Sequence, residues 1–273
     1  MRRALVRAWP TLALALVSLL VLAPLGWMVA VSLMPAGASA RVPAPLWPRH
    51  PTLANYRALF ADYAVARPLI NSLAVSAIGT VAGLALMVPA GYAFAKLRFA
   101  GRERLLASLV ALLVVPSQVA MLPLFLLLKS TGLVNSYAGA VAPWLAGLYG
   151  VLFVRQAALS IPDEMLDAGR VDGASEAQLF RLVALPLLRP VVATLALATF
   201  LGVWNDFLWP LIVLTDDRLY TLPVALASLS REHAQDAELM MAGSVVTVLP
   251  VMLLYLLLQR HYVAGVLGGG VKG

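Results

Sequence analysis

The sequence predicts an all-α integral membrane protein with six transmembrane helices. Of its 273 residues, 62% are hydrophobic and only 12% are charged, whereas a soluble domain of this length is about half apolar. The mean hydropathy is +0.88, so the bilayer rather than water is the solvent that suits this composition. The apolar residues also gather into runs that are long enough to cross a membrane as helices.

Six apolar segments reach the roughly 20 residues that a helix needs to cross the hydrocarbon core. They are residues 11–34, 69–95, 105–128, 138–159, 191–214 and 240–259. A basic N-terminus and Ala38-Ser39-Ala40 after the first segment are typical of a cleaved signal peptide. The apolar core of a signal peptide is only about 7–15 residues long. We therefore expect the first segment to remain as an uncleaved transmembrane helix.

The basic residues predict that both ends of the chain lie in the cytoplasm. Lys and Arg in short loops near the ends of spans stay on the cytoplasmic side. The deciding cluster lies between the second and third spans and contains Lys96, Arg98, Arg102 and Arg104. This orientation places the loops 34–68 and 215–239 on the outer side of the cell membrane.

The sequence lacks the residues that several other classes of function require. The net charge is +7, but the basic residues lie in short clusters between spans and not on one face with aromatic residues, so no nucleic-acid partner is expected. The chain has no cysteine, and its three histidines are far apart. It also has no G-x-x-x-x-G-K-[ST] phosphate loop, H-E-x-x-H motif or G-x-S-x-G motif. We therefore expect neither an enzyme nor a cofactor or metal site in this chain.

Between the fourth and fifth predicted spans, residues 161–190 have the pattern of two short helices outside the bilayer. Ser160 can cap the first helix, and Pro162 suits its first turn. Negative charge is favourable near the N-terminal end of a helix dipole. The first helix carries three acidic residues there, namely Asp163, Glu164 and Asp167.

The dipeptide Asp172-Gly173 predicts a turn before the second helix. Ser175 followed by Gln178 has the spacing of a capping box, and Pro186 and Pro190 are expected to end the helix before the fifth span. Its apolar side consists of Leu179, Phe180, Leu182 and Val183. Such a pair must bury this side, either against its own bundle or lipid headgroups, or against a soluble partner. The residues alone leave both alternatives open.

The segment 161–190 resembles the EAA loop of ATP-binding cassette (ABC) importer permeases. That pattern is E-A-A, three residues, G, about nine residues, an aliphatic residue, one residue and L-P. This chain has Asp167-Ala168-Gly169, then Gly173, then Val183 and Leu185-Pro186. Aspartate replaces the leading glutamate and glycine replaces the second alanine, which preserves the charge and the small size.

Other motifs extend the resemblance over essentially the whole chain, to the maltose-type carbohydrate-importer branch that depends on a binding protein. They are Asn71-Ser72, residues 91–95 with Arg98-Phe99, Pro116-Ser117-Gln118, residues 204–210, residues 220–223 and the C-terminal residues 270–273. The resemblance implies the type I ABC importer (MetI-like) transmembrane fold. It also implies three partners: a second homologous permease, a cytoplasmic ABC ATPase dimer that binds ATP and Mg, and an extracytoplasmic solute-binding protein.

In such importers the EAA loop docks as a coupling helix into a groove on the ATPase. By resemblance, Asp167 and Asp172 would offer charges to the ATPase, and Leu179 and Phe180 would fill an apolar pocket on it. Gly173 would permit a close turn, and the alternative is that it is only a C-cap glycine. The expected coupling residues are Glu164, Asp167, Ala168, Asp172, Gly173, Ala174, Leu179, Phe180, Leu185 and Pro186.

Polar residues in the third and fifth spans are candidates for the translocation path, because charge within a span is expensive and usually functional. They are Gln118, Trp204, Asn205 and Asp206. A simpler interpretation, which we favour from the sequence, is that Asn205 and Asp206 cap a helix break before Pro210, or that the tryptophans mark the membrane interface.

We therefore predict three regions: a first span with its outer loop at 1–66, an importer core at 67–260, and a cytoplasmic tail at 261–273. The predicted function is that of a permease subunit importing a sugar or related polyol. The alternative is an ion-coupled secondary carrier, which the scarcity of ionisable residues within the spans disfavours. A membrane-bound scaffold is a third choice.

Overall fold

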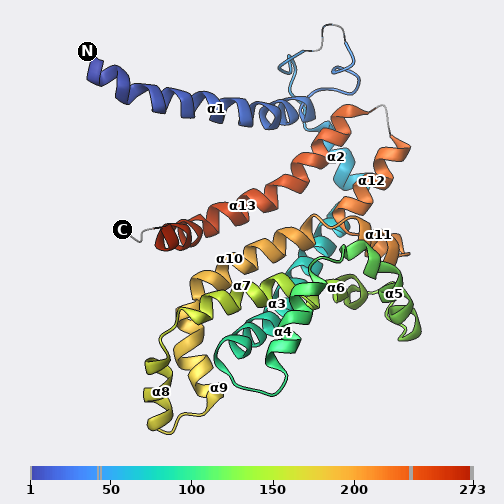
Figure 1. Cartoon of the computed structure of the whole chain (residues 1–273). Helices are drawn as coiled ribbons and strands as arrows, with labels where there is room; N and C mark the ends of the chain where they lie inside the picture. The colour runs from blue at the N-terminus through green and yellow to red at the C-terminus, as the bar shows by residue number, and fades with distance from the viewer. Residues whose placement is uncertain (1, 42, 44, 234–235, 271–273) are drawn as a thin grey trace. The chain divides into compact units, whose positions relative to one another are not determined.

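The computed structural model describes residues 2–41, 43, 45–233 and 236–270, with side chains from residue 9 to residue 257 of these. The described chain is helical, and it contains no strand (Figure 1). It divides into two compact units: residues 1–67 with 225–250, and residues 68–224 with 251–273. The two units are described separately below. The end of the predicted tail, residues 271–273, lies outside the described residues.

Four helices of the described chain are long and apolar enough to cross a membrane, and the number of spans rises to six if each of two pairs of bent helices forms one span. The four helical spans lie within α1 (Arg2–Ser32), α3 (Ala66–Lys96), the helix Glu176–Trp204 and α13 (Ala237–Gly270). The bent pairs are α4 (Arg102–Leu112) with α5 (Ser117–Ser130), and α6 (Tyr137–Leu145) with α7 (Leu148–Leu159). The predicted all-α membrane fold is thereby confirmed.

The third span is not the straight helix that residues 105–128 predict. Between α4 and α5 the chain bends by 106°. Pro116 ends the bend as the N-cap of α5, with an extended ψ of 134°. Helix α4 already ends at Leu112, and because proline disfavours helical backbone at the residue before it, the helix cannot resume through Val115 despite the unbroken apolar run.

The sequence predicts that Pro186 and Pro190 end the helix that begins after residue 175. The structure contradicts this prediction, because the helix continues through both prolines. Helix α9 (Glu176–Leu179), a π-helical turn (Phe180–Ala184) and α10 (Leu185–Trp204) follow one another without a break. Pro186 stands in the first turn of α10, and the amide of Leu185 bonds the carbonyl of Phe180 across the wider π turn. The wider π turn makes room for the proline ring. The proline has no N–H to donate, and the hydrogen-bond pattern of the π turn does not require one at this position. Helices in lipid also tolerate proline well.

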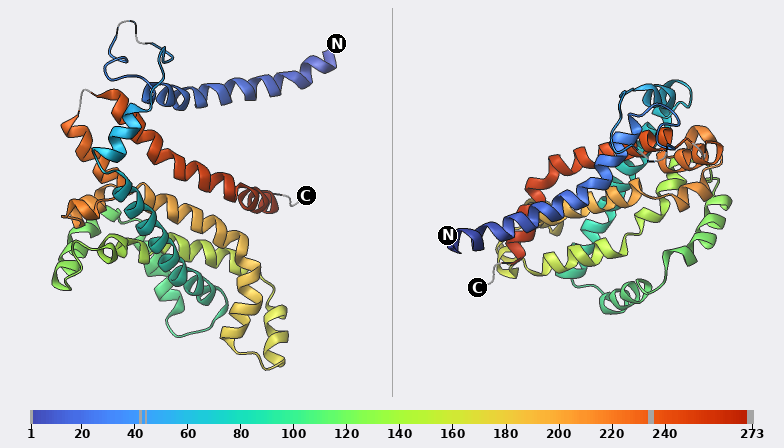
Figure 2. Two further views of the ribbon diagram at one scale, coloured as in Figure 1. Left: turned by 180° about the vertical axis from the view of Figure 1, so that it is seen from behind. Right: turned by 90° about the horizontal axis from the view of Figure 1, so that it is seen from above.

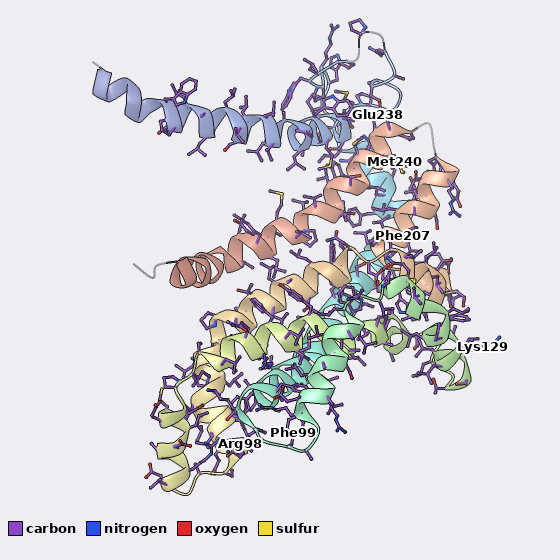
Figure 3. All side chains as sticks on the ribbon, in the orientation of Figure 1. Arg98, Phe99, Lys129, Phe207, Glu238 and Met240 are labelled. Carbon is purple, nitrogen blue, oxygen red and sulfur yellow. The ribbon has the colours of Figure 1, made fainter. Side chains whose placement is uncertain are left out.

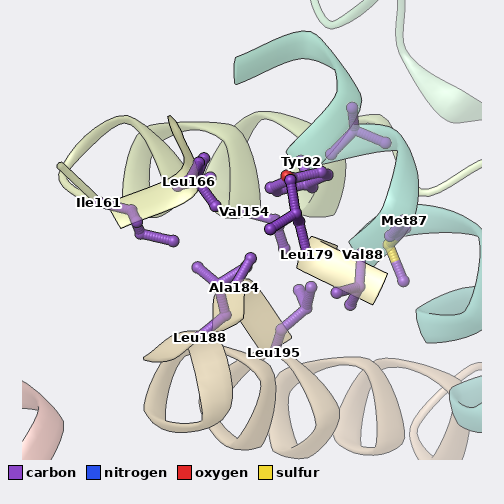
Figure 4. Packing of buried hydrophobic residues seen from close by; sticks show 12 residues of the cluster. Met87, Val88, Tyr92, Val154, Ile161, Leu166, Leu179, Ala184, Leu188 and Leu195 are labelled. Atoms are coloured by element: carbon purple, nitrogen blue, oxygen red, sulfur yellow. The ribbon is translucent and has the colours of Figure 1, made fainter. Parts of the chain in front are cut away.

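The second unit holds two apolar clusters, and both include residues of α3 and α10. Helices α7 and α10 lie beside one another (Figure 2). One cluster joins Val88 and Tyr92 of α3 to Val154 of α7, Leu166 of α8 (Asp163–Val171) and Leu188 of α10 (Figure 4). The other surrounds Trp209 of α11 (Leu208–Val213) and includes residues of α3, α5, α6 and α10. The first cluster fixes residues 161–190 to the spans.

The first unit contains α1, α2 (Ala54–Ala61), most of α12 (Leu222–Glu232) and the first part of α13. The amide of Asn55 donates to the carbonyl oxygens of Ser32 and Met34, at 2.8 and 2.9 Å. The backbone N–H of Ser39 donates to the carboxylate of Glu238 at 2.7 Å. These bonds hold the long loop after α1 in place.

Candidate functional site

The segment 161–190 folds as two helices joined by a turn, as predicted. Helix α8 begins at Asp163, with Asp163 and Glu164 in its first turn and Pro162 as its N-cap. Ser160 was expected to cap it, but its hydroxyl donates to the carbonyl of Ala157, in the preceding helix α7. Ser160 lies too early in the chain, because Pro162 separates it from the first free amides of α8.

Gly173 ends α8 in a Schellman motif. Its φ is +83°, a left-handed conformation that glycine adopts without a steric penalty. Its N–H bonds the carbonyl of Arg170 at 3.0 Å, and the N–H of Ala174 bonds the carbonyl of Gly169 at 2.9 Å. These two bonds define the motif. Gly173 is therefore a C-cap glycine. It is also exposed, so a contact between Gly173 and a docked ATPase stays a prediction.

A capping box begins the second helix, as predicted. The backbone N–H of Gln178 donates to the hydroxyl of Ser175, and the side chain of Gln178 accepts from the backbone N–H of Ser175 at 2.8 Å. Both free amides at this helix start are thus satisfied locally. The turn between the helices is capped from both sides and needs no partner to form.

The inner side of the two helices is buried against the chain itself. Leu166 and Leu179 are each 1% exposed and belong to the same cluster. Gly169 lies directly beneath Leu179, because a Cβ at position 169 would collide with the Leu179 side chain. The glycine that replaces the second alanine of the EAA pattern therefore allows the close approach of α8 and α9.

The expectation that Leu179 and Phe180 fill a pocket on a partner is wrong for Leu179, which is enclosed in the core. Phe180 is half-buried, and its ring lies 5.1 Å from the ring of Tyr92 on α3. Leu185, Pro186 and Ala174 are also only partly exposed. The predicted apolar side is therefore divided: Leu179 lies in the core and Phe180 and Val183 pack partly against it, whereas Leu182 is 73% exposed.

The outer face of α8 carries a mixture of acidic and apolar side chains. Met165 is 46% exposed and Val171 is 87% exposed, and sequence reasoning missed both. The spacing of Met165, Ala168 and Asp172 puts these three residues on one side of a helix, a signal that would have found Met165 but not Val171. The exposed residues of this outer face are Glu164, Met165, Asp167, Ala168, Val171, Asp172 and Gly173.

Arg170 holds the turn together electrostatically. Its guanidinium donates to Asp167 at 2.6 Å and to Glu176 at 2.7 Å. The hydrogen bonds to Glu176 and Asp167 raise the pKa of Arg170 above its ordinary value. All three side chains are partly or largely open to solvent, so the network orients the acidic groups more than it stabilises the fold.

Lys96, the last residue of α3, attaches the start of α8 to the spans, and sequence reasoning assigned it only an orienting role. Its ammonium donates to the carbonyl of Ile161 at 2.5 Å and to the carboxylate of Asp163 at 2.6 Å. The Lys96 side chain is 6% exposed. Its hydrogen bond and charge lower the pKa of Asp163 below the ordinary 3.8.

The candidate path residues do not form one site. Gln118 is exposed in the first turn of α5, and Trp204 is buried beside Phe200. Asn205 ends α10, where its side chain donates to the carbonyl of Leu201. The four residues therefore occupy different environments in the described chain.

Asp206 marks the predicted helix break. One oxygen of its carboxylate accepts the backbone N–H of Trp209 at 3.3 Å, and the other accepts the indole N–H of Trp144 at 3.3 Å. These bonds connect α6 to the junction of α10 and α11. The capping interpretation of Asp206 is thereby confirmed, whereas a role in translocation stays a prediction. Within the described residues, no group of three His, Asp or Glu side chains could hold a metal ion.

The described chain thus has four to six candidate spans and a capped helical turn at the start of one of them, as a membrane transport subunit would. Residues 87–267 match the family model described as binding-protein-dependent transport system inner membrane component. This match covers more than half of the chain, so the chain belongs to the family of binding-protein-dependent transport system inner membrane components. The predicted class of protein is confirmed.

Individual relatives agree with this assignment. The chain is similar to the arabinooligosaccharides transport system permease protein AraQ of Bacillus subtilis (strain 168), with 35% identity over 96% of this chain and 95% of the relative. It is 33% identical to the lactose transport system permease protein LacG of Rhizobium radiobacter, over 78% of each chain. Its fold is similar to a bacterial ABC transporter involved in the import of the acidic polysaccharide alginate, with a TM-score of 0.83, 21% identity and coverage of 95% of this chain and 97% of that chain.

Proposed function

We propose that this permease imports a carbohydrate or related polyol and that the outer face of α8 docks onto a separate ABC ATPase. The observation that carries the proposal is the division of α8 into two sides. Leu166 is enclosed, whereas Met165 and Val171 stand exposed among acidic residues. An apolar patch with an acidic border on a water-exposed helix is typical of a protein interface.

The continuous helix after α8 gives the docked face a mechanical connection to the membrane. Residues 176–204 run from the capping box through the π turn into α10 without interruption. A displacement of α8 by a closing ATPase dimer would therefore move a span as a rigid lever. Gly173 would keep the turn fixed during this movement.

The proposal includes the partners and the orientation. The family depends on a solute-binding protein, and six spans suit one half of a pathway that a second homologous permease completes. ATP and Mg would be bound by the ATPase and not by this chain. Both termini and the segment 161–190 would face the cytoplasm, because the basic cluster 96–104 lies on that side.

A carbohydrate solute is supported by the relatives, two of which transport arabinooligosaccharides and lactose by name. In this chain the exposed polar side chains of Gln118 and Asn205, together with Asp206, offer hydrogen-bond partners to hydroxyl groups. Trp204 would act indirectly, because it is buried. Uptake of a panel of labelled sugars, with and without ATP depletion or vanadate, would identify the solute.

The docking proposal is tested by co-purification of the ATPase with a tagged permease complex. Met165→Glu and Val171→Glu add charge to the apolar part of the outer face, and each should reduce the recovered ATPase by about tenfold or more. Leu46→Glu is a matched control, since Leu46 is an exposed apolar residue in the loop after α1. Full recovery of ATPase with both α8 variants, at normal membrane levels, would exclude docking at this face.

A further inference from the structure

Helix α3 binds other parts of the second unit at both of its ends through buried polar side chains. At one end Lys96 holds the start of α8, and at the other end Asn71 and Ser72 hold the segment that follows α11. These are polar groups that a span can bury only when they are hydrogen-bonded. Each of them bonds at least one backbone group of a segment outside α3.

At the Lys96 end, the bonds fix the position where α8 begins. The carbonyl of Ile161 and the carboxylate of Asp163 both accept from the ammonium. Ile161 itself is buried in the same cluster as Tyr92. The start of α8 is thus attached to α3 by a charged group that is almost enclosed, where a hydrogen bond is stronger than in water.

At the other end, both the nitrogen and the oxygen of the Asn71 side-chain amide form hydrogen bonds. Its nitrogen donates to the carbonyl oxygens of Arg218 and Tyr220, at 2.9 and 3.0 Å. Its oxygen accepts the hydroxyl of Tyr137 at 2.7 Å. An amide with every strong bond directed at neighbouring segments orients those segments and has no freedom to rotate.

Ser72 strengthens this attachment. Its hydroxyl oxygen accepts the backbone N–H of Leu222 at 2.7 Å, and both Ser72 and Leu222 are buried. Residues 218–222 are therefore held to α3 at three backbone positions. In the proposed orientation this segment belongs to the outer loop 215–239, on the side where a binding protein would approach.

Between its two attached ends α3 is packed as a continuous helix. Lys96 follows Asn71 by 25 positions, which at the rise of an α-helix is about 37 Å, enough to cross the hydrocarbon core. Gly83 and Gly91 approach the backbones of Trp144 and Val151 too closely for a Cβ. Pro89 is exposed, but Met87 and Val88 before it and Tyr92 after it are buried, so packing on the opposite side restrains the kink that a proline would allow.

We propose that α3 is a strut that joins the ATPase-docking segment to the outer segment 218–222, with Lys96 and Asn71 as its positioning residues. Movement of α8 is transmitted through Lys96 to α3 and through Asn71 to the outer backbone. The two ends then respond together to ATP. This inference rests on the proposed function, because it requires an ATPase on α8.

A spin label on the outer segment tests the strut without knowledge of the solute. The chain has no cysteine, so Asp217→Cys provides a single exposed labelling position beside the Asn71 contacts. The labelled permease is purified with its partner subunits in lipid nanodiscs. The spectrum of the label and the trapped nucleotide are measured before and after addition of ATP and vanadate.

We expect trapping to change the spectrum of the label in the otherwise unmodified complex. Lys96→Met and Asn71→Ala should each reduce this change by about twofold or more while trapped nucleotide stays constant. The double variant should lose little beyond the worse single variant, because the two residues act in series. Lys96→Arg should restore the response. Lys129→Met is the matched control, since Lys129 is exposed at the end of α5 (Figure 3).

The outcomes separate the strut from the docking proposal. An unmodified complex without trapped nucleotide contradicts docking itself. Trapped nucleotide with a full label response in Lys96→Met overturns the strut, as does a double variant whose losses add. If Lys96→Met does not assemble, Asp163→Asn replaces it, because that substitution at an exposed position removes the negative charge that pairs with Lys96. An unchanged response in Asp163→Asn together with Asn71→Ala then overturns the proposal.

Discussion

Exposed apolar side chains occur on both α1 and α8, but they have different causes. Between Trp9 and Ser32 helix α1 carries no charged residue, and from Trp9 to Val29 its apolar side chains are mostly exposed on all sides, with Leu20 at 73%. On α8 the exposed Met165 and Val171 stand among acidic residues, and the opposite side is buried. Exposure all round without charge indicates contact with lipid or another span, whereas exposure on one charged side indicates a soluble partner.

The largest expected effect tests whether α8 has an inner side. Leu166→Asp places an unpaired charge in the cluster of α3, α7 and α10, which should destabilise the permease by about 4 kcal/mol or more. The expected result is loss of folded protein in detergent, measured by fluorescence-detected size exclusion after heating. Met165→Asp, one residue away on the outer side, should leave the melting temperature nearly unchanged. Equal losses in both variants would mean that α8 has no preferred side.

The next effect separates lipid contact from protein contact. Leu20→Glu places a charge near the middle of α1, at a cost of about 3 kcal/mol for insertion into a membrane. Val171→Glu should leave insertion unchanged and reduce only ATPase recovery. Membrane levels of both variants, measured after alkaline extraction, check the comparison. Normal insertion of Leu20→Glu would show that α1 faces water or a protein surface at this depth.

Features of α8 and α1 that depend on nearby residues were predictable from the sequence. The turn at Gly173 and the capping box at Ser175 were predictable, because their bonds join residues at most five positions apart. The break at Asp206 was readable for the same reason. Membrane spans were predictable as well, because a long apolar segment without charges is unstable in water and is best buried in the bilayer.

Features that depend on distant segments were not predictable. The enclosure of Leu179 depends on α3, α7 and α10, and the bonds of Lys96 join residues 65 and 67 positions apart. The continuity of the helix through Pro186 depends on a π turn that no local pattern indicates. Local bonding rules therefore describe the ends of elements, and the side that each element presents is decided by tertiary packing.

A smaller effect separates the two roles considered for Gly173. Gly173→Val should destabilise the turn by about 1–2 kcal/mol, because a branched side chain resists the positive φ. Gly173→Asn should be nearly neutral, since asparagine tolerates this conformation. The space around position 173 is open, so any loss of ATPase binding by a stable Gly173→Asn variant reports contact with the partner. Thermal stability and ATPase recovery are measured side by side on the two variants.

The smallest expected effect concerns the attachment of α8 and its dependence on pH. Lys96 lowers the pKa of Asp163 below 3.8, so the attachment is fully present above that value and weakens as pH falls through the lowered pKa. A label at Val171→Cys should therefore report constant α8 mobility between about pH 5 and 8, and increased mobility only below about pH 4. Asp163→Asn should remove this acid response. A transition centred near about pH 6 would mean that a group with the ordinary pKa of histidine, and not the carboxylate of Asp163, controls the attachment.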